Sequence, residues 1–142
     1  MKAKWFKIYE VVDKDTYFTR QEEERWGLFP EDAIIMIDGL REYFDAPVTV
    51  NNWWWGGQLQ YRGYRPPWCM VGAPQSYHKR GQAFDCDIKG LNANDARKKI
   101  IDNQHEPMLR HIGRMELGVN WLHIDTGPRL RENGEGIYVF YP

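Results

Sequence analysis

The sequence predicts an α+β fold, in which a small mixed or antiparallel sheet has helices packed on it. One segment repeats apolar residues every three or four positions, as an amphipathic helix does, and another alternates apolar and acidic residues, as a half-buried strand does. Helical and strand-like segments follow one another in mixed order, which favours the α+β class. With 142 residues, the chain is expected to fold as a single domain, 1–142.

Two helices are expected in the chain. Pro30 begins the first, because proline suits a first helical turn and Glu31 and Asp32 there face the positive end of the helix dipole. This helix has one apolar stripe that should pack on the sheet, formed by Ile34, Ile37, Leu40 and Phe44. Asn94 can cap the second helix, which continues through Ile101.

Short strands are expected where β-branched and aromatic residues gather or alternate with polar ones. These segments are 47–52, 58–65, 83–88, 120–125 and 136–140, with a loop at 66–75. Within the third segment, Asp85 and Asp87 lie on one face, opposite the apolar residues Phe84, Cys86 and Ile88. This strand therefore presents two carboxylates on its outward face.

Composition and charge exclude several classes of partner. The 19 Lys and Arg residues against 20 Asp and Glu give a formal net charge of -1, so no basic field exists to hold a nucleic acid. No apolar stretch is long enough to insert into a membrane, and the N-terminal segment lacks the apolar region of a secretory signal. We expect a monomer that is cytoplasmic on synthesis and acts elsewhere only after release.

Aromatic residues are abundant, and cysteines are few. Seven tryptophans include three consecutive ones at Trp53–Trp55, for which core packing and the wall of a ligand cleft are both open interpretations. Cys69 and Cys86 are too few for a disulfide framework. Because Cys86 points away from its neighbour Asp85, we expect it to be a small core residue.

Two short segments carry side chains that bind metals. His78 lies on an expected loop, and Asp85 follows seven residues later on a strand. In the second segment, strand alternation puts Trp121, His123 and Asp125 on one face, so that a second histidine can meet the first pair. Two imidazoles and one carboxylate form a common catalytic zinc site, whose fourth position is open to water.

The residues around these ligands resemble a known family. The pattern Ser-x-His-x-x-Gly-x-Ala-x-Asp at 76–85, followed by Trp-x-His-x-Asp at 121–125, resembles the zinc peptidases of the D-alanyl-D-alanine carboxypeptidase family. Relatives include L-alanyl-D-glutamate endopeptidases among phage endolysins and, more distantly, the hedgehog signalling domain. The resemblance covers residues 45–142 and implies a hedgehog/DD-peptidase-like fold.

The resemblance implies one zinc ion per chain, held by His78, Asp85 and His123. It also makes Glu116 the expected catalytic base, since the segment around it resembles the part of the family that carries a carboxylate before the second histidine. Some relatives hold this acid three residues before the histidine, where this chain has Asn120. Asp125 is therefore an alternative base, or a residue that orients an imidazole.

The resemblance also implies residues that bind the substrate. Arg65 resembles the arginine that holds a carboxylate of the substrate, and Arg62 competes for this role because the following loop is short. A salt bridge is the alternative role for either arginine. Ser76 is expected to contact substrate or to brace the His78 loop, and Trp121 to stack on substrate or to wall the site.

The implied activity is hydrolysis of a peptide bond in bacterial peptidoglycan, as a carboxypeptidase or an endopeptidase. The short chain without a signal resembles a phage lysis enzyme, which reaches the cell wall after another protein opens the membrane. One alternative is a catalytically inactive virion-structural or wall-binding module on the same fold. Another is a metal-free carbohydrate-binding domain built around Trp53–Trp55.

Overall fold

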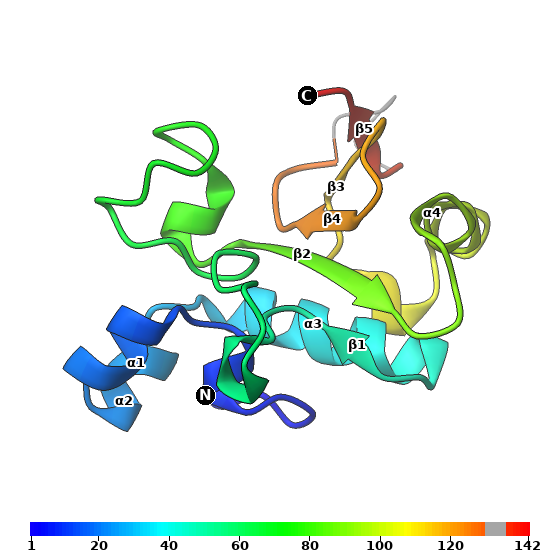
Figure 1. The fold of residues 1–142 in the computed structure, drawn as a ribbon. Helices are drawn as coiled ribbons and strands as arrows, with labels where there is room; N and C mark the ends of the chain where they lie inside the picture. The colour runs from blue at the N-terminus through cyan, green and yellow to red at the C-terminus, as the bar shows by residue number, and fades with distance from the viewer. Residues whose placement is uncertain (130–135) are drawn as a thin grey trace.

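A computed structural model describes residues 1–129 and 136–142, and it has the expected α+β class (Figure 1). The α-helices are α1 (Lys14–Thr19), α2 (Glu22–Trp26), α3 (Glu31–Phe44) and α4 (Ala93–Asp102). The strands are β1 (Val48–Thr49), β2 (Ala83–Ile88), β3 (Arg114–Glu116), β4 (Leu122–Asp125) and β5 (Tyr138–Phe140). Short 3₁₀ helices are η1 (Ile8–Glu10), η2 (Trp53–Trp55), η3 (Tyr77–Arg80) and η4 (Pro107–Leu109).

The described strands form one mixed sheet in the order β1-β2-β4-β3-β5. The pairs β1–β2, β2–β4 and β3–β4 are antiparallel, whereas β3 and β5 are parallel. At the centre, the register places Asp85 opposite His123 and Ala83 opposite Asp125. The two central strands therefore bring both sequence motifs together.

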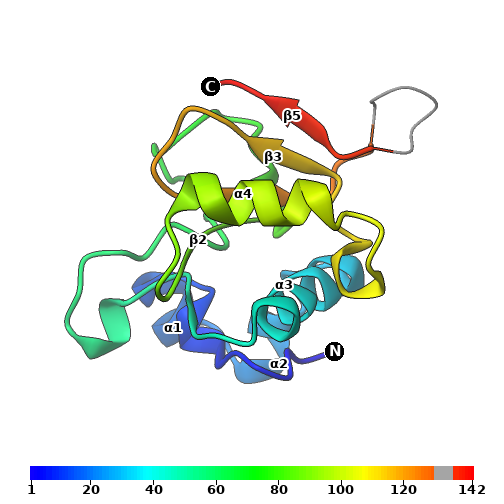
Figure 2. The same ribbon diagram turned by 90° about the vertical axis from the view of Figure 1, so that its right-hand side faces the viewer.

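One face of the two central strands forms the core. Phe84 and Cys86 of β2 are buried there with Leu122 and Ile124 of β4. Helices α3 and α4 both contact β2, and Figure 2 shows α4 lying across β2 and β3 with α3 below it. Because side chains alternate along a strand, burying this face turns Asp85 and His123 to the opposite face. The core thus determines where the metal-binding side chains point.

The segment at 58–65 is the main error of the sequence prediction, because it is not a strand. Its backbone groups bond to loops and side chains instead: the amide of Tyr64 donates to the carbonyl of Val11, and that of Arg62 donates to the side chain of Asn51. The backbone of the segment is tied to β2 by the hydrogen bond from the amide of Asp85 to the carbonyl of Arg62, and side-chain bonds from two arginines, described below, add to it. The segment therefore lies beside the sheet as an irregular chain.

Smaller differences concern the ends of elements. Asn92 caps α4 through its side chain, whereas Asn94 lies inside the helix and accepts a hydrogen bond from Arg97. Strand β4 begins at Leu122, later than expected. Strand β3 was not predicted, since three residues are too few to establish an alternating pattern.

The three consecutive tryptophans form η2, and they belong neither to the buried core nor to the wall of the cleft described below. Trp53 donates its indole N–H to the carbonyl of Val12, and Trp54 stacks on Tyr9 with ring centroids 4.4 Å apart. Trp55 remains largely exposed. This cluster belongs to the N-terminal part of the molecule and does not line the cleft described below.

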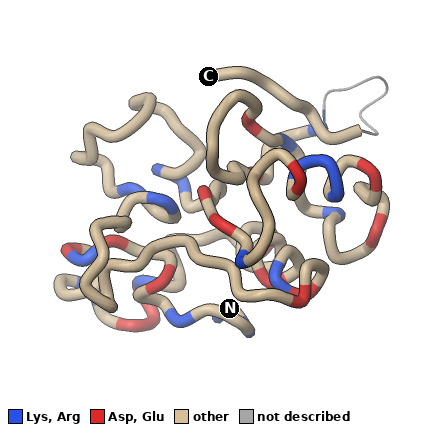
Figure 3. Tube along the Cα trace, turned by 45° about the vertical axis from the view of Figure 1, so that its right-hand side comes forward, with Lys and Arg blue, Asp and Glu red and all other residues tan. Residues whose placement is uncertain are grey.

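Basic and acidic positions are interspersed along the described trace (Figure 3). Among the described helices, none combines the length and the apolar character needed to cross a membrane.

Candidate metal centre

His78 is positioned by a short 3₁₀ helix with defined ends. The Ser76 hydroxyl accepts a hydrogen bond from the His78 amide at 3.1 Å, which caps η3. Gly81 ends the helix with a φ of +68°, and a Cβ there would lie 2.1 Å from the Leu28 carbonyl oxygen. Of the two roles open to Ser76, bracing the His78 loop is the one that this hydrogen bond supports.

His78, Asp85 and His123 form a buried group on the outward face of the sheet. Each offers one ligand atom, and these atoms lie within 4.8 Å of one another. Asp85 Oδ1 lies 3.2 Å from His78 Nε2 and 2.8 Å from His123 Nδ1. The exposed fractions of these three residues are 3%, 6% and 7%, so little water competes for their ligand atoms. This group can hold a metal ion.

The other ring nitrogen of each histidine has its own partner. His78 Nδ1 lies 2.8 Å from the Gly63 carbonyl oxygen, which can only accept, so Nδ1 carries the proton and Nε2 is free to bind a metal. His123 Nε2 lies 2.9 Å from Asp125 Oδ2. When Nε2 carries the proton and donates it to Asp125, Nδ1 of this ring is the nitrogen that can bind a metal. Both rings are thus held with their ligand nitrogens facing Asp85.

The ionisation of the group suits a metal site. Burial lowers the pKa of His78, and the nearby Asp85 offsets this only in part, which favours the neutral form of the ring. Burial acts to raise the pKa of Asp85, but its close contacts with the His123 and His78 rings outweigh burial, so the pKa is lowered. Burial likewise acts to lower the pKa of His123, yet hydrogen bonds with Asp125 and Asp85 raise it to about 9. A metal ion at Nδ1 of His123 would displace the proton held there.

The Asp125 carboxylate accepts hydrogen bonds from several neighbouring groups. It accepts from Arg114 Nε at 2.9 Å and Nη2 at 3.0 Å, from the Gly127 amide at 2.9 Å, and from His123. Burial acts to raise its pKa, and the hydrogen bonds with His123 and Arg114 lower it. A buried carboxylate with four such contacts is a poor proton acceptor and orients His123 instead.

Glu116 lies on β3 and lines the same cleft as the three ligands. Its neighbour Met115 is buried in the core, so strand alternation turns Glu116 and Arg114 to the outward face. Within 1–129 and 136–142, the Glu116 carboxylate makes no hydrogen bond or ion pair. Of the two candidate bases, Glu116 is therefore the one with free acceptor atoms.

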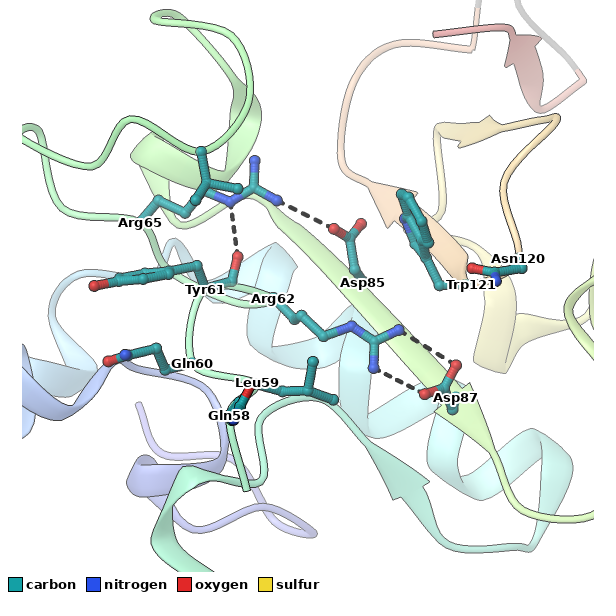
Figure 4. Close-up of a pocket in the computed structure, with 11 residues that line it drawn as sticks. Gln58, Leu59, Gln60, Tyr61, Arg62, Arg65, Asp85, Asp87, Asn120 and Trp121 are labelled. Atoms are coloured by element: carbon teal, nitrogen blue, oxygen red, sulfur yellow. Dashed lines mark hydrogen bonds and ion pairs between the residues drawn. The ribbon is translucent and has the colours of Figure 1, made fainter. Parts of the chain in front are cut away.

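The two arginines have different partners (Figure 4). Arg65 is buried and donates from Nη2 to Asp85 Oδ2 at 3.2 Å and from Nε to the Tyr61 carbonyl at 2.7 Å. Arg62 forms a two-point ion pair with Asp87, at 2.8 and 3.3 Å. Asp87 is therefore neutralised by Arg62. Of the two arginines, Arg65 is the one whose side chain directly borders the metal group.

A cleft with two arms runs past the metal group. The metal arm, of about 650 Å³, is lined by His78, Asp85, Glu116 and His123 among others. The glutamine arm, of about 530 Å³, is lined by Gln58–Arg62, Asp87 and Asn120. Four residues line both arms, namely Arg65, Val71, Asp85 and Trp121. Trp121 is half-buried and forms part of the cleft wall at this junction.

The sequence prediction missed three residues that support the site. Gly63 contributes only a carbonyl, and no side-chain pattern reveals such a contact. Arg114 holds Asp125 from a strand that was not recognised. Arg97, buried on α4, donates to the carbonyls of Val119 and Trp121, each at 3.0 Å, and thereby fixes the loop that carries Trp121.

No family model matches the chain, and neither a curated protein nor a solved structure matches it. Any function assigned to the chain therefore rests on the sequence motif and on the site itself.

Proposed function

We propose that this protein is a zinc metallopeptidase that hydrolyses a peptide bond in bacterial peptidoglycan, on a hedgehog/DD-peptidase-like fold. The observation that carries the proposal is the buried group of His78, Asp85 and His123, whose ligand atoms all lie within 4.8 Å of one another. Two imidazole nitrogens and one carboxylate oxygen are the donors of many catalytic zinc sites. The hydrogen bonds at Gly63 and Asp125 are the outer contacts that such ligands usually have.

Zinc, when bound, acidifies water and polarises a carbonyl group. In this proposal, Glu116 takes the proton from the attacking water and delivers it to the leaving amine. Its free carboxylate in the metal arm favours it over Asp125, which keeps His123 oriented. Asn120 takes no part in proton transfer, because an amide does not accept a proton at neutral pH.

Arg65 binds a carboxylate of the substrate next to the bond that is cut. Its position at the junction of the two arms puts the guanidinium beside the metal group, where it can hold a substrate with little freedom. The likeness of the sequence motif to phage endolysins favours a lysis enzyme that reaches the wall after release.

Digestion of purified cell wall tests the proposal. The zinc-loaded protein should release new amino groups, a chelator should stop the release, and added zinc should restore it. A zinc-loaded protein with no such activity would identify the inactive structural or wall-binding module instead. A protein that binds wall glycan without containing metal would indicate the carbohydrate-binding domain.

A further inference from the structure

A second pocket lies in the N-terminal part of the molecule, apart from the metal group. It is formed by the first residues of the chain, η1, α1 and α2, and its volume of about 370 Å³ lies within the roughly 300–1,000 Å³ typical of ligand pockets. Figure 1 shows α1 and α2 in the part of the molecule that contains the N-terminus. The pocket shares no lining residue with either arm of the cleft, so the proposed chemistry does not use it.

Arg25, on α2, brings an unpaired positive charge to this pocket. Its guanidinium stacks on the Tyr17 ring of α1, with Cζ 4.2 Å from the ring centroid. Its Nε is buried without a hydrogen-bond partner, and within 1–129 and 136–142 its side chain makes no hydrogen bond or ion pair. Stacking uses the face of a guanidinium, so the Nη donors in its plane are available to the oxygens of an anion. A half-buried cation without a partner therefore favours an anion beside it.

The other charged residues of the lining leave a positive excess. Lys2 pairs with Glu22 at 3.1 Å, and both side chains are exposed. Lys7 makes no ion pair with any described residue, although its charge acts on Glu10, whose carboxylate accepts from the Lys7 amide at 2.7 Å. The lining thus contains three cations and one acid, and Arg25 is the cation with the least compensation.

Aromatic rings form much of the remaining wall. Phe6 and Trp26 are buried members of it. Tyr9 and Tyr17 are half-buried, with ring centroids 6.3 Å apart, and Trp54 holds Tyr9 in place by stacking on it. Such rings offer a flat apolar surface to the body of a ligand and little to a bare hydrated ion. The pocket therefore suits an anion that is carried on a ring.

We propose that this pocket binds a small organic oxyanion, a carboxylate or a phosphate monoester attached to a ring. Arg25 donates to the anionic oxygens, Lys7 adds a second positive charge, and the rings of Tyr9 and Tyr17 contact the body of the ligand. This site goes beyond the proposed function, and its test needs neither metal nor wall substrate.

Titration of the full chain with phenyl phosphate and with benzoate, followed by ¹H–¹⁵N NMR, tests the proposal. The signals of the Arg25 Nε–H and the Trp26 indole N–H should shift and saturate with a Kd of about 1 mM or below, a strength that ligands of this size can reach. Phenol has the ring without the charge, and inorganic phosphate has the charge without the ring, so each should bind at least about tenfold more weakly. A saturable shift with either organic anion supports the proposal, and the ratio of the two Kd values shows which anion the pocket prefers.

Variants identify the anchoring charge. Arg25→Gln should raise the Kd of phenyl phosphate by about tenfold or more, because it removes the donors of a charge-assisted hydrogen bond. Arg20→Gln is the matched control, since Arg20 is exposed at the end of α1 and does not line the pocket, and the Kd should stay within about twofold. Lys7→Gln should raise the Kd by about two- to fivefold, as expected for an exposed charge.

The absence of a saturable shift with both organic anions would overturn the proposal. Equal binding of phenol and phenyl phosphate, or equal Kd values for Arg25→Gln and Arg20→Gln, would overturn it as well. If Arg25→Gln does not fold, Lys7→Gln takes its place in this comparison, and an unchanged Kd would again contradict the site. None of these measurements depends on metal content or on wall cleavage, so their failure would leave the proposed function standing.

Discussion

His123 Nε2 lies 2.9 Å from Asp125 Oδ2, while the opposite nitrogen of the same ring faces Asp85 Oδ1 at 2.8 Å. The ring thus connects the carboxylate of Asp85, one of the candidate metal ligands, to a second carboxylate that is itself held by Arg114. In the proposed mechanism, Asp125 therefore orients His123 and Glu116 transfers the proton. Replacing Glu116 or Asp125 by its amide should therefore affect activity and zinc binding in different ways.

Glu116→Gln should keep both fold and zinc, because the amide has nearly the same shape, and should lose activity by roughly 10²–10⁴-fold, the usual contribution of a general base. Asp125→Asn should instead weaken zinc binding by roughly 10–100-fold, and added zinc should partly rescue it. Wall-peptide cleavage by both variants at low and saturating zinc distinguishes the roles. A fully active Glu116→Gln beside an inactive, zinc-loaded Asp125→Asn would transfer the base to Asp125.

Arg65→Ala should retain zinc and lose most activity on wall peptides, because it removes a substrate contact and no metal ligand. Arg62→Ala should lose less, since Arg62 is bound by Asp87 and lies farther along the glutamine arm. Steady-state kinetics with metal analysis of both variants provides the measurement. The reverse order of the two losses would show that Arg62 is the carboxylate-binding residue.

Gly81→Ala should destabilise the protein more than Gly90→Ala. Both glycines have positive φ, +68° and +80°, so each substitution carries the left-handed cost of about 1–2 kcal/mol. At Gly81 the new Cβ would also lie 2.1 Å from the Leu28 carbonyl oxygen, whereas nothing lies within 4 Å at Gly90. Urea unfolding of the two variants measures the difference. Equal losses would mean that the close approach beneath η3 does not constrain the His78 loop.

Cys86 should resist alkylation in the folded protein. It is fully buried behind Asp85, and burial raises the pKa of its thiol, so the reactive thiolate is scarce. Mass spectrometry after brief treatment with iodoacetamide at pH 8 should find Cys86 unmodified, and unfolding in guanidinium should make it react. Rapid labelling without denaturant would contradict the packing of β2 against the core.

The parts of the site that follow strand alternation could be predicted from the sequence. The spacing of Asp85 against the buried Phe84 and Cys86, and of His123 against Leu122 and Ile124, determines which side chains face outward. The expected strand at 58–65 failed for a physical reason, because its backbone groups bond to loops and side chains that no local pattern reveals. For the same reason, the contact between the Gly63 carbonyl and His78 could not be predicted.

Contacts between the site and residues distant in the chain could not be predicted from the sequence either. Arg97 lies within α4 but donates to the carbonyls of a loop more than twenty residues later. Nothing in its own segment distinguishes it from a surface arginine. Strand β3 was missed because pairing with β4 and β5, rather than its own three residues, defines it as a strand.

Metal content tests the central claim most directly. Elemental analysis of the purified protein should find about one zinc per chain. The same analysis of His78→Ala should find almost none, because the substitution removes one of three ligands. His105→Ala is the matched control, as this exposed histidine lies outside the group and should keep the full amount. A metal-free wild type, or a His78→Ala variant that keeps its zinc, would contradict the account.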